Sequence, residues 1–384
     1  MTITPPGRSA QHGEVRRHNT AAVLQSVLTA GPLSRAEIAI RVGLSQGTVS
    51  KIVGPMLSSG LLAEEPARAA AGGRPQVPLA INPGARLAVG LHLGMQRTTA
   101  GLVDMRGHVG TVRVRSRRPA GPERLTGEAA EMVAKLIAQA EAPVLGVGAT
   151  TGGWVDGTSG VVLANEALGW SEVPLAQLLA SRLDVPVLVE SSVRAQAGAE
   201  LWFGCAQHAR STVHLFVGNV IDAAFAIDRK IYRGFRSAAG LAGHLPLAGG
   251  TPHAVATDKA VVATARESGL IGDAEGLPEL AARARGGDLA ADAVLSERAR
   301  QVGVLVAMLV DLLDPDQVVL AGGVLAVPGH LDVVREVVAT GPRPGWDPAR
   351  VIATALGPDL LVSSSAAVVL GAYVADPLAF EDFG

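Results

Sequence analysis

The sequence is poor in cysteine, in aromatic residues and in long apolar runs. It holds one cysteine, Cys205, among 384 residues, which excludes a disulfide within the chain and a cysteine-rich zinc site. A reducing cytoplasm is then the expected setting. The longest apolar run, from Val302 to Leu313, is too short to span a bilayer, and residues 1–13 lack the apolar core of a signal peptide. We therefore expect a cytoplasmic protein with no membrane partner.

The net charge is small but unevenly distributed. It is −2 for the whole chain, yet residues 1–80 hold eight Arg and Lys against four Glu, so this segment carries +4 and the remainder −6. Such asymmetry predicts that the N-terminal part meets a polyanion. At 384 residues the chain is long enough for two or three domains with full cores.

Two helix starts lie close together between Leu33 and Gly60. Ser34 and Glu37 have the spacing of a capping box, and the N-cap pattern returns eleven residues later at Ser45. Gly43 stands where a helix C-cap belongs. A helix, a short glycine turn and a second helix form the layout of a helix-turn-helix DNA reader. The alternative is an ordinary helical hairpin with a solvated face.

The second of these helices has one apolar and one polar face. The spacing of a buried helix face is followed by Val49, Ile52, Val53, Met56 and Leu57. The opposite face is small and polar and carries Gln46, Gly47, Ser50 and Lys51. Such a face suits contact with bases and phosphates in a major groove. Pro55 predicts that the helix breaks or kinks at Gly54.

Two short strands are expected at Leu61–Glu65 and Gln76–Ala80, joined by a loop over Pro66–Pro75. This is the pattern of the wing in a winged helix. Two glycines before Arg74 would let the backbone approach DNA and place this arginine in a minor groove, where the negative potential is strongest. A floppy loop with a stray arginine is the alternative.

A first helix is expected from Val15 to Thr29, behind a basic entry that can reach phosphates. Together with the helix pair and the wing it completes a predicted DNA-binding surface. The residues assigned to that surface are Arg16, Arg17, Ser34, Arg35, Ser45, Gln46, Gly47, Thr48, Ser50, Lys51 and Arg74.

From Arg86 onward, strands and helices alternate. Strands are expected at Leu87–Leu93, Thr98–Asp104, Val109–Val114, Val144–Val147, Val213–Val217, Ala223–Asp228, around Ile231 and at Gln317–Leu320, and helices at Glu123–Ala140, near Val255–Ser268 and at Asp288–Leu313. The distances from Gly94 to Asp104 and from Gly218 to Asp228 are both 10 residues, a weak repeat that suggests two related lobes. We expect sheets covered by helices, with a ligand cleft between the lobes.

Several short motifs stand in a characteristic order along the chain. They are Gly72-Gly73-Arg74-Pro75, Gly152-Gly153-Trp154-Val155-Asp156, Leu168-Gly169-Trp170, Tyr232-Arg233-Gly234, Ala239-Gly240-Leu241-Ala242-Gly243-His244 and Leu320-Ala321-Gly322-Gly323. In this order the chain resembles the ROK family (repressors, open reading frames, kinases), and specifically its transcription-factor branch. The resemblance covers nearly the whole chain.

The resemblance implies an α/β protein: an N-terminal winged helix-turn-helix followed by an actin-like, hexokinase-type (ribonuclease H-like) bilobal domain. The expected divisions are a disordered tail over 1–14, the DNA-binding domain over 15–82 and the bilobal domain over 83–384. Within the last, lobe 1 covers about 86–190 plus a C-terminal helix at about 364–376, and lobe 2 covers about 191–363.

Measured against the family's sugar kinases, the nucleotide and catalytic positions are altered. In the first glycine hairpin, His92 and Met95 stand in the places of an aspartate and a glycine, and in the second hairpin Val220 and Asp222 replace glycines. ATP binding is therefore not expected, because only bare backbone can present N–H donors so close to phosphate. The catalytic aspartate is replaced by Ser192, which cannot serve as a general base at neutral pH.

The family's zinc and sugar sites are also incomplete. His244 matches the zinc-binding histidine, but the following segment has no cysteine, so no metal is expected. His253 and Asp258 are alternative ligands, although chance proximity is the better explanation. The candidate effector pocket consists of Gly152, Ser191, Ser192, Leu241 and His244. His244 is either a sugar contact or a core histidine whose hydrogen bonds are satisfied within the protein.

These observations predict a transcription regulator, as a repressor, that binds an inverted-repeat DNA operator as a homodimer or tetramer. The kinase-like domain would be a catalytically inactive sensor or dimerisation module without cofactor, with a sugar or sugar derivative as the possible effector. Two alternatives stay open. One is a sugar kinase with a fused DNA-binding head, and the other is a regulator whose C-terminal domain is only a scaffold.

Overall fold

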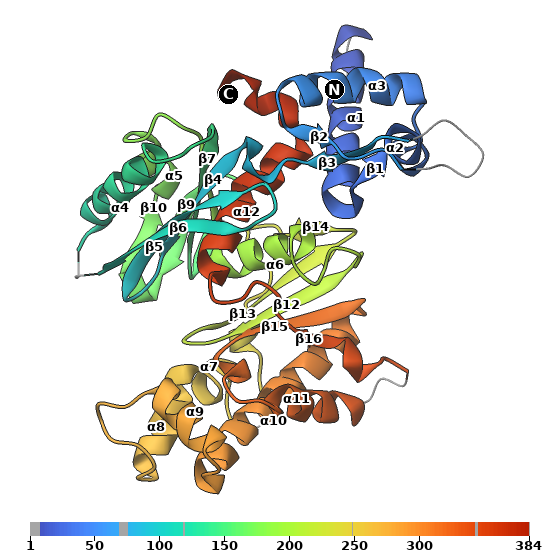
Figure 1. Ribbon diagram of the computed structural model, residues 1–384. Coiled ribbons are helices and arrows are strands. Elements are labelled where there is room, and N and C mark those ends of the chain that lie inside the picture. The colour runs from blue at the N-terminus through green and yellow to red at the C-terminus, as the bar shows by residue number, and fades with distance from the viewer. Residues whose placement is uncertain (1–7, 69–75, 118–119, 248, 342–344, 384) are drawn as a thin grey trace, which may run out of the picture.

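A computed structural model describes residues 8–68, 76–117, 120–247, 249–341 and 345–383. The molecule is elongated, with a small N-terminal unit at one end, a first helix-covered sheet in the middle and a second at the far end (Figure 1). No helix of the described ranges is long and apolar enough to cross a membrane.

The N-terminal unit combines three helices with a small antiparallel sheet of order β1-β3-β2. Its elements are α1 (Arg8–Ala30), β1 (Leu33–Ser34), α2 (Arg35–Val42), α3 (Gln46–Ser58), β2 (Leu62–Glu64) and β3 (Pro78–Ile81). One core holds all of them, since Leu24, Ile38, Val49 and Leu79 are fully buried in the same apolar cluster. The predicted winged helix is confirmed by this arrangement, because β2 and β3 form the antiparallel stem of the wing.

Two expectations for this unit were wrong. The first helix begins at Arg8, so a helix replaces the disordered tail predicted over residues 8–14; good helix formers such as Ala10, Gln11 and Glu14 extend it. Residues 1–7 lie outside the described ranges. The second helix runs through Pro55 to Ser58 without breaking. Proline removes a single backbone bond near the helix end, and burial of Val53 and Met56 on either side of it outweighs that loss.

Two five-stranded sheets follow, with the orders β11-β7-β4-β5-β6 and β14-β13-β12-β15-β16. The first is built from β4 (Leu87–Leu93), β5 (Arg97–Asp104), β6 (Val109–Ser116), β7 (Val144–Thr151) and β11 (Val187–Ser191). The second is built from β12 (Thr212–Val217), β13 (Ile221–Ile227), β14 (Lys230–Tyr232), β15 (Gln317–Gly322) and β16 (Val351–Ala353).

The two sheets have the same topology. Each opens with three antiparallel strands in sequence, and each then adds two parallel strands beside the first. The weak repeat between the Gly94 and Gly218 turns therefore marks two related lobes. A third, small sheet of order β10-β9-β8 extends the first lobe and consists of β8 (Trp154–Asp156), β9 (Val161–Asn165) and β10 (Trp170–Val173).

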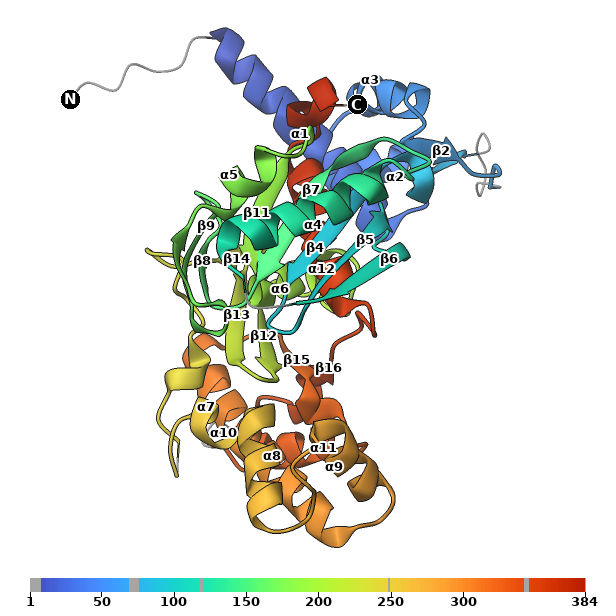
Figure 2. The same cartoon turned by 90° about the vertical axis from the view of Figure 1, so that its left-hand side faces the viewer.

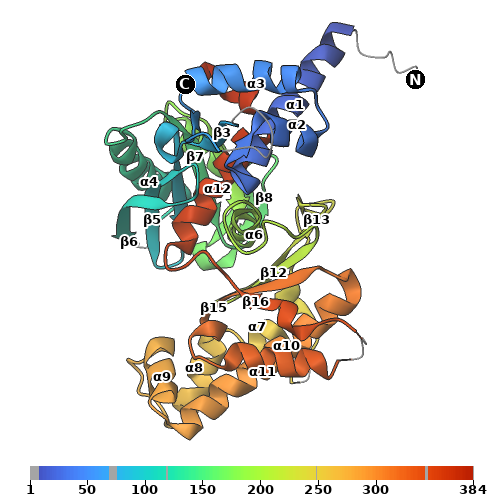
Figure 3. The ribbon, with the colours of Figure 1, turned by 45° about the vertical axis from the view of Figure 1, so that its right-hand side comes forward.

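Helices cover the sheets and separate them. The helices of the first lobe and of the middle layer are α4 (Pro122–Ile137), α5 (Leu175–Ala180), α6 (Ser192–Trp202) and α12 (Leu360–Ala375). Figures 2 and 3 show α4 on the outer side of the first sheet, and α6 and α12 between the two sheets. Gly90 and Gly148 permit the close approach of α12, because a Cβ atom on either would collide with the helix backbone at Val362 and Ser365.

The second lobe is closed by helices at the far end of the molecule. They are α7 (Pro252–Val255), α8 (Asp258–Glu267), α9 (Leu277–Arg285), α10 (Leu289–Leu313) and α11 (His330–Ala339). The single helix expected near Val255–Ser268 is two, because Thr257 caps a new helix by accepting a hydrogen bond from the Ala260 amide at 3.2 Å. Sequence reasoning did not anticipate α6, α9 or α11.

Candidate nucleic-acid interface and the cleft between the lobes

Caps fix both ends of α2 and the start of α3. The Ser34 amide donates to the Glu37 carboxylate at 2.7 Å, and the Glu37 amide donates to the Ser34 hydroxyl at 3.3 Å. The pKa of Glu37 is lowered chiefly by the hydrogen bond from the Ser34 backbone. Gly43 ends α2 in the left-handed conformation, and Ser45 starts α3 by accepting from the Thr48 amide at 3.1 Å. The predicted caps are therefore all present.

The two faces of α3 separate as the apolar stripe predicts. Val49 and Val53 are at most 1% exposed, and Met56 is buried as well. The polar residues of the opposite face, Gln46, Gly47, Ser50 and Lys51, are all exposed. The helix thus presents a short polar surface with one cation, anchored from behind by the core of the unit.

The basic residues near α3 differ in whether they form ion pairs. Arg16 and Arg17 are exposed on α1, although Arg17 lies 3.9 Å from the Asp376 carboxylate. Arg35 is paired with Glu64 at 3.0 Å. Ser34 was wrongly assigned to the DNA-binding surface: it is only 3% exposed and its hydroxyl is engaged in the helix cap, so its role is structural.

The stem of the wing extends one step beyond its strands. The backbones of Arg68 and Gln76 exchange hydrogen bonds of 2.8 and 3.0 Å, which continues the hairpin to the base of the loop. The predicted contact residue Arg74, with the glycines before it, lies outside the described residues.

The cleft between the lobes is filled by a buried ion-pair cluster. Arg194 donates to the Glu190 carboxylate at 2.7 Å and to the Val155 and Ser237 carbonyls at 2.5 and 2.9 Å. Arg233 holds the other oxygen of Glu190 at 2.8 Å. The remaining cavity has a volume of about 20 Å³, which is room for about one water molecule. A pocket of this volume does not hold a hexose, and a ligand cleft between the lobes stays a prediction.

The five predicted effector residues do not converge on this cavity. Ser191 and Leu241 line it, while Gly152, Ser192 and His244 are not among its lining residues. The Gly152 carbonyl accepts from Asn165 at 2.9 Å. The Ser192 hydroxyl lies 3.4 Å from Nδ1 of His92, and the His244 ring stacks edge-on against His253 with 4.9 Å between centroids.

Burial shifts the pKa values of two side chains in the cleft. Desolvation lowers the pKa of His92 to about 4, so its ring is neutral at pH 7. Desolvation raises the pKa of Asp222 to about 7 against the opposing effect of Arg194. Asp222 lines the small cavity with Arg194.

The second glycine hairpin faces a carboxylate that the sequence did not reveal as important. A Cβ atom on Gly218 would lie 3.7 Å from an Asp258 carboxylate oxygen. Asp258 is held there by Arg298, which is 2% exposed and also donates to the Ala256 carbonyl at 2.8 Å. The ion pair of Asp258 and Arg298 therefore lies beside the Gly218 hairpin. The signal was absent from the sequence because Arg298 and Asp258 are far apart along the chain.

The described ranges contain no set of side chains arranged to bind a metal ion. No group of three or more histidine, cysteine or acidic side chains is arranged to hold an ion there. His253 lies beside His244, and burial is the main cause of its lowered pKa. Asp258 is occupied by Arg298 instead.

Comparisons with known proteins agree with this description. The ROK family model matches residues 88–341. A protein of Mycobacterium tuberculosis described as a transcriptional regulator is 33% identical over 93% of this chain and 86% of its own length. The DNA-binding transcriptional dual regulator NagC of Escherichia coli is 25% identical over 83% of this chain and 84% of its own length.

Among solved structures, a ROK family transcriptional regulator described as a homologue of the Escherichia coli MLC protein has a TM-score of 0.79 at 20% identity, covering 94% of this chain and 97% of its own. At that identity the likeness concerns the fold, and it includes the N-terminal unit because nearly the whole chain is covered.

Proposed function

The chain belongs to the ROK family, and on this premise we propose how it acts as a DNA-binding transcriptional regulator. The proposal depends above all on the exposed polar face of α3. Gln46 can hydrogen-bond the edge of an adenine, and Lys51 can reach a guanine or a phosphate, in a major groove about as wide as a helix. Gly47 leaves room for close approach at the same face.

The flanking groups position this helix on the DNA backbone. Arg16 and Arg17 are exposed on α1, and Thr48 and Ser50 offer hydroxyls beside Lys51. Such contacts set register and contribute a salt-dependent share of the affinity. We propose Arg74 of the wing as a further contact in the adjacent minor groove.

The regulator acts as a repressor on an inverted repeat, in this proposal. A dimer or tetramer places paired winged helices about one helical turn apart on DNA. The DNA-binding domain covers 15–82 and the bilobal domain 83–384, with lobe 1 at about 86–190 plus the C-terminal helix and lobe 2 at about 191–363.

The kinase-like domain is catalytically inactive in this proposal. Ser192 occupies the place of the general base, and Asp258 stands beside the phosphate hairpin. The cluster of Glu190 and Arg194 fills the space that a sugar would need. The domain then serves as a sensor or dimerisation module, and a sugar effector enters only when the lobes part.

DNA binding is tested by selecting bound fragments from genomic DNA and measuring affinity for the recovered site at several salt concentrations. Lys51→Ala should weaken binding and reduce the magnitude of the salt slope by about 1 if Lys51 contacts a phosphate. Lys135→Ala, which removes an exposed cation on α4, is the matched control and should behave as wild type. Equal binding by all three proteins would contradict the assignment of α3.

Catalysis is tested with a coupled assay for nucleotide consumption against a panel of hexoses. No turnover above a blank is expected, because loss of a general base alone typically costs about 10²- to 10⁴-fold. Turnover that disappears in Ser192→Ala would favour the alternative of a kinase with a fused DNA-binding head. Thermal unfolding with the same sugars separates a sensor from a scaffold, since only a sensor is stabilised by its ligand.

A further inference from the structure

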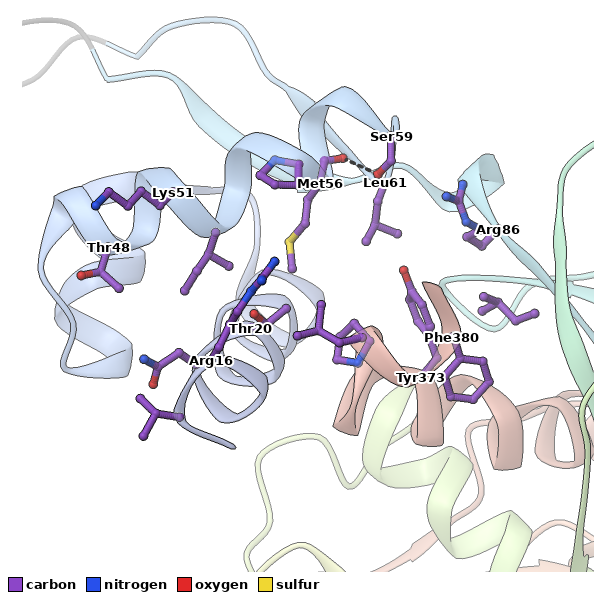
Figure 4. A pocket seen from close by; sticks show the side chains of 17 residues that line it. Arg16, Thr20, Thr48, Lys51, Met56, Ser59, Leu61, Arg86, Tyr373 and Phe380 are labelled. Atoms are coloured by element: carbon purple, nitrogen blue, oxygen red, sulfur yellow. Dashed lines mark hydrogen bonds between the residues drawn. The ribbon is translucent and has the colours of Figure 1, made fainter. Parts of the chain in front are cut away.

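A second cavity in the described part of the chain lies away from the cleft between the lobes. It has a volume of about 620 Å³, within the range of small-molecule sites, and it sits where the N-terminal unit meets the first lobe (Figure 4). We call it the junction cavity. Its walls come from α1, α3, the start of β4, from β7, and from α12 with the following turn η6 (Pro377–Phe383).

The floor of the junction cavity is apolar. Met56, Leu61, Leu145 and Tyr373 are each less than 10% exposed and line it. Tyr373 packs edge-on against Phe380 with 5.6 Å between ring centroids. In a chain with only 3% aromatic residues, this pair gives the cavity a wall suited to an apolar ligand.

Three cations surround this floor. Arg16 comes from α1, Lys51 from α3 and Arg86 from the segment before β4. Figure 4 shows the Arg16 guanidinium directed into the space, whereas the Lys51 amine points away from it and Arg86 lies on the opposite side. None of the described lining residues is acidic.

The charges of these three side chains are not balanced within the described ranges. Arg17 and Arg35, also basic residues of the N-terminal unit, form ion pairs with Asp376 and Glu64. No ion pair links Arg16, Lys51 or Arg86 to any carboxylate described. Cations that border an apolar cavity without a counter-charge favour an anionic ligand, because desolvation near an apolar wall strengthens the attraction.

We propose that the junction cavity binds a small amphipathic carboxylate, with its acidic head held by Arg16, the cation directed into the space, and its apolar tail on the floor formed by Met56, Leu145 and Tyr373. The site differs from the kinase-like cleft in position, in size and in ligand chemistry.

Ligand binding at this site would oppose DNA binding. Arg16 belongs both to the cavity lining and to the predicted DNA-binding surface, so the acidic head and a DNA phosphate compete for the same cation. A ligand that bridges α3 and α12 also fixes the angle between the DNA-binding unit and the first lobe. This regulatory consequence rests on the proposed function, whereas binding itself can be measured without DNA.

The probe is decanoate, titrated into the full chain by calorimetry below its micellar concentration, and its counterpart is decyltrimethylammonium, which has the same tail and the opposite charge. We expect saturable binding of one decanoate per chain and at least tenfold weaker binding of the cation. Absence of saturable decanoate binding, or equal affinity for the two probes, would overturn the proposal.

Variants locate the site. Arg16→Gln removes the cation that is directed into the cavity and should weaken decanoate about tenfold, the loss typical of a charged hydrogen bond. Arg300→Gln, on α10 in the other lobe, is the matched control and should bind as wild type. Ser59→Trp places a large ring at an exposed position of the lining and should abolish binding while the thermal unfolding midpoint stays near that of wild type. Wild-type affinity in both Arg16→Gln and Ser59→Trp would show that decanoate binds elsewhere.

Discussion

Polar side chains are exposed on α3 but buried in the cleft between the lobes. On α3, Gln46, Ser50 and Lys51 are exposed. In the cleft, Arg194 and Glu190 are both about 4% exposed and satisfy each other. Polar groups left in water remain available for a ligand, whereas groups paired inside the protein have become part of its stability. The exposed groups on α3 can therefore bind a ligand, whereas the buried pair in the cleft stabilises the fold.

The largest expected effect tests whether the cleft cluster is structural. Glu190→Gln leaves Arg194 buried without its counter-charge and should lower the free energy of unfolding by about 3–5 kcal/mol. Urea unfolding at pH 7 measures it. Glu128→Gln on α4, which removes a partner of two exposed arginines, should change stability by about 0–1 kcal/mol. Equal effects of the two substitutions would remove the contrast between cleft and surface.

A second effect should appear as a dependence of stability on pH. The folded pKa of Asp222 is about 7, above its ordinary value of 3.8, so the folded state binds more protons between these values and wild-type stability falls as pH rises from about 4 to about 7. Asp222→Asn should therefore be more stable than wild type at pH 8 by roughly 2 kcal/mol. The advantage should shrink towards pH 4. A constant difference between the two proteins across this range would show that Asp222 is not desolvated.

The exposed face of α3 should show its effect in binding and not in stability. Gln46→Ala should weaken binding to the selected site by about 1–3 kcal/mol and relax base preference at one position. Competition with single-base variants of that site measures the preference. An unchanged base preference would mean that Gln46 does not read sequence, even if affinity falls.

The smallest effect separates two serines of the same unit. Ser34→Ala removes the buried cap of α2 and should cost about 1 kcal/mol of stability, while Ser50→Ala, on the exposed face, should change stability by less than about 0.5 kcal/mol. The order should reverse for DNA affinity. Thermal unfolding and DNA titration of the two variants together check it.

Local sequence signals predicted the N-terminal unit well. The caps at Ser34, Gly43 and Ser45 involve residues a few positions apart, so spacing alone identifies them. The strands β4 to β7 and β12 to β15 were also predicted closely, because most of them are apolar runs. The strands β8 to β11 and β16 were not predicted. The same reasoning failed at Pro55, where packing of the helix outweighed a local breaker, and for α6, whose buried polar residues hide its periodicity.

Contacts between residues far apart in the chain could not be predicted from the sequence. The replacement of the catalytic base by Ser192 is visible by resemblance, but nothing in the chain order indicates that Arg298 holds Asp258 beside the Gly218 hairpin, 40 residues away from its partner. The junction cavity is built from the first 86 residues, β7 and the last helix, and no motif announces it.

The sequence by itself determined the elements, their caps and the family, because these depend on short-range hydrogen bonding, apolar periodicity and motif order. Only the tertiary structure decided which polar residues are available. Exposure and ion pairing depend on distances between segments far apart in the chain. These distances pair Arg194 with Glu190 between the lobes and leave Arg16, Lys51 and Arg86 around an apolar cavity.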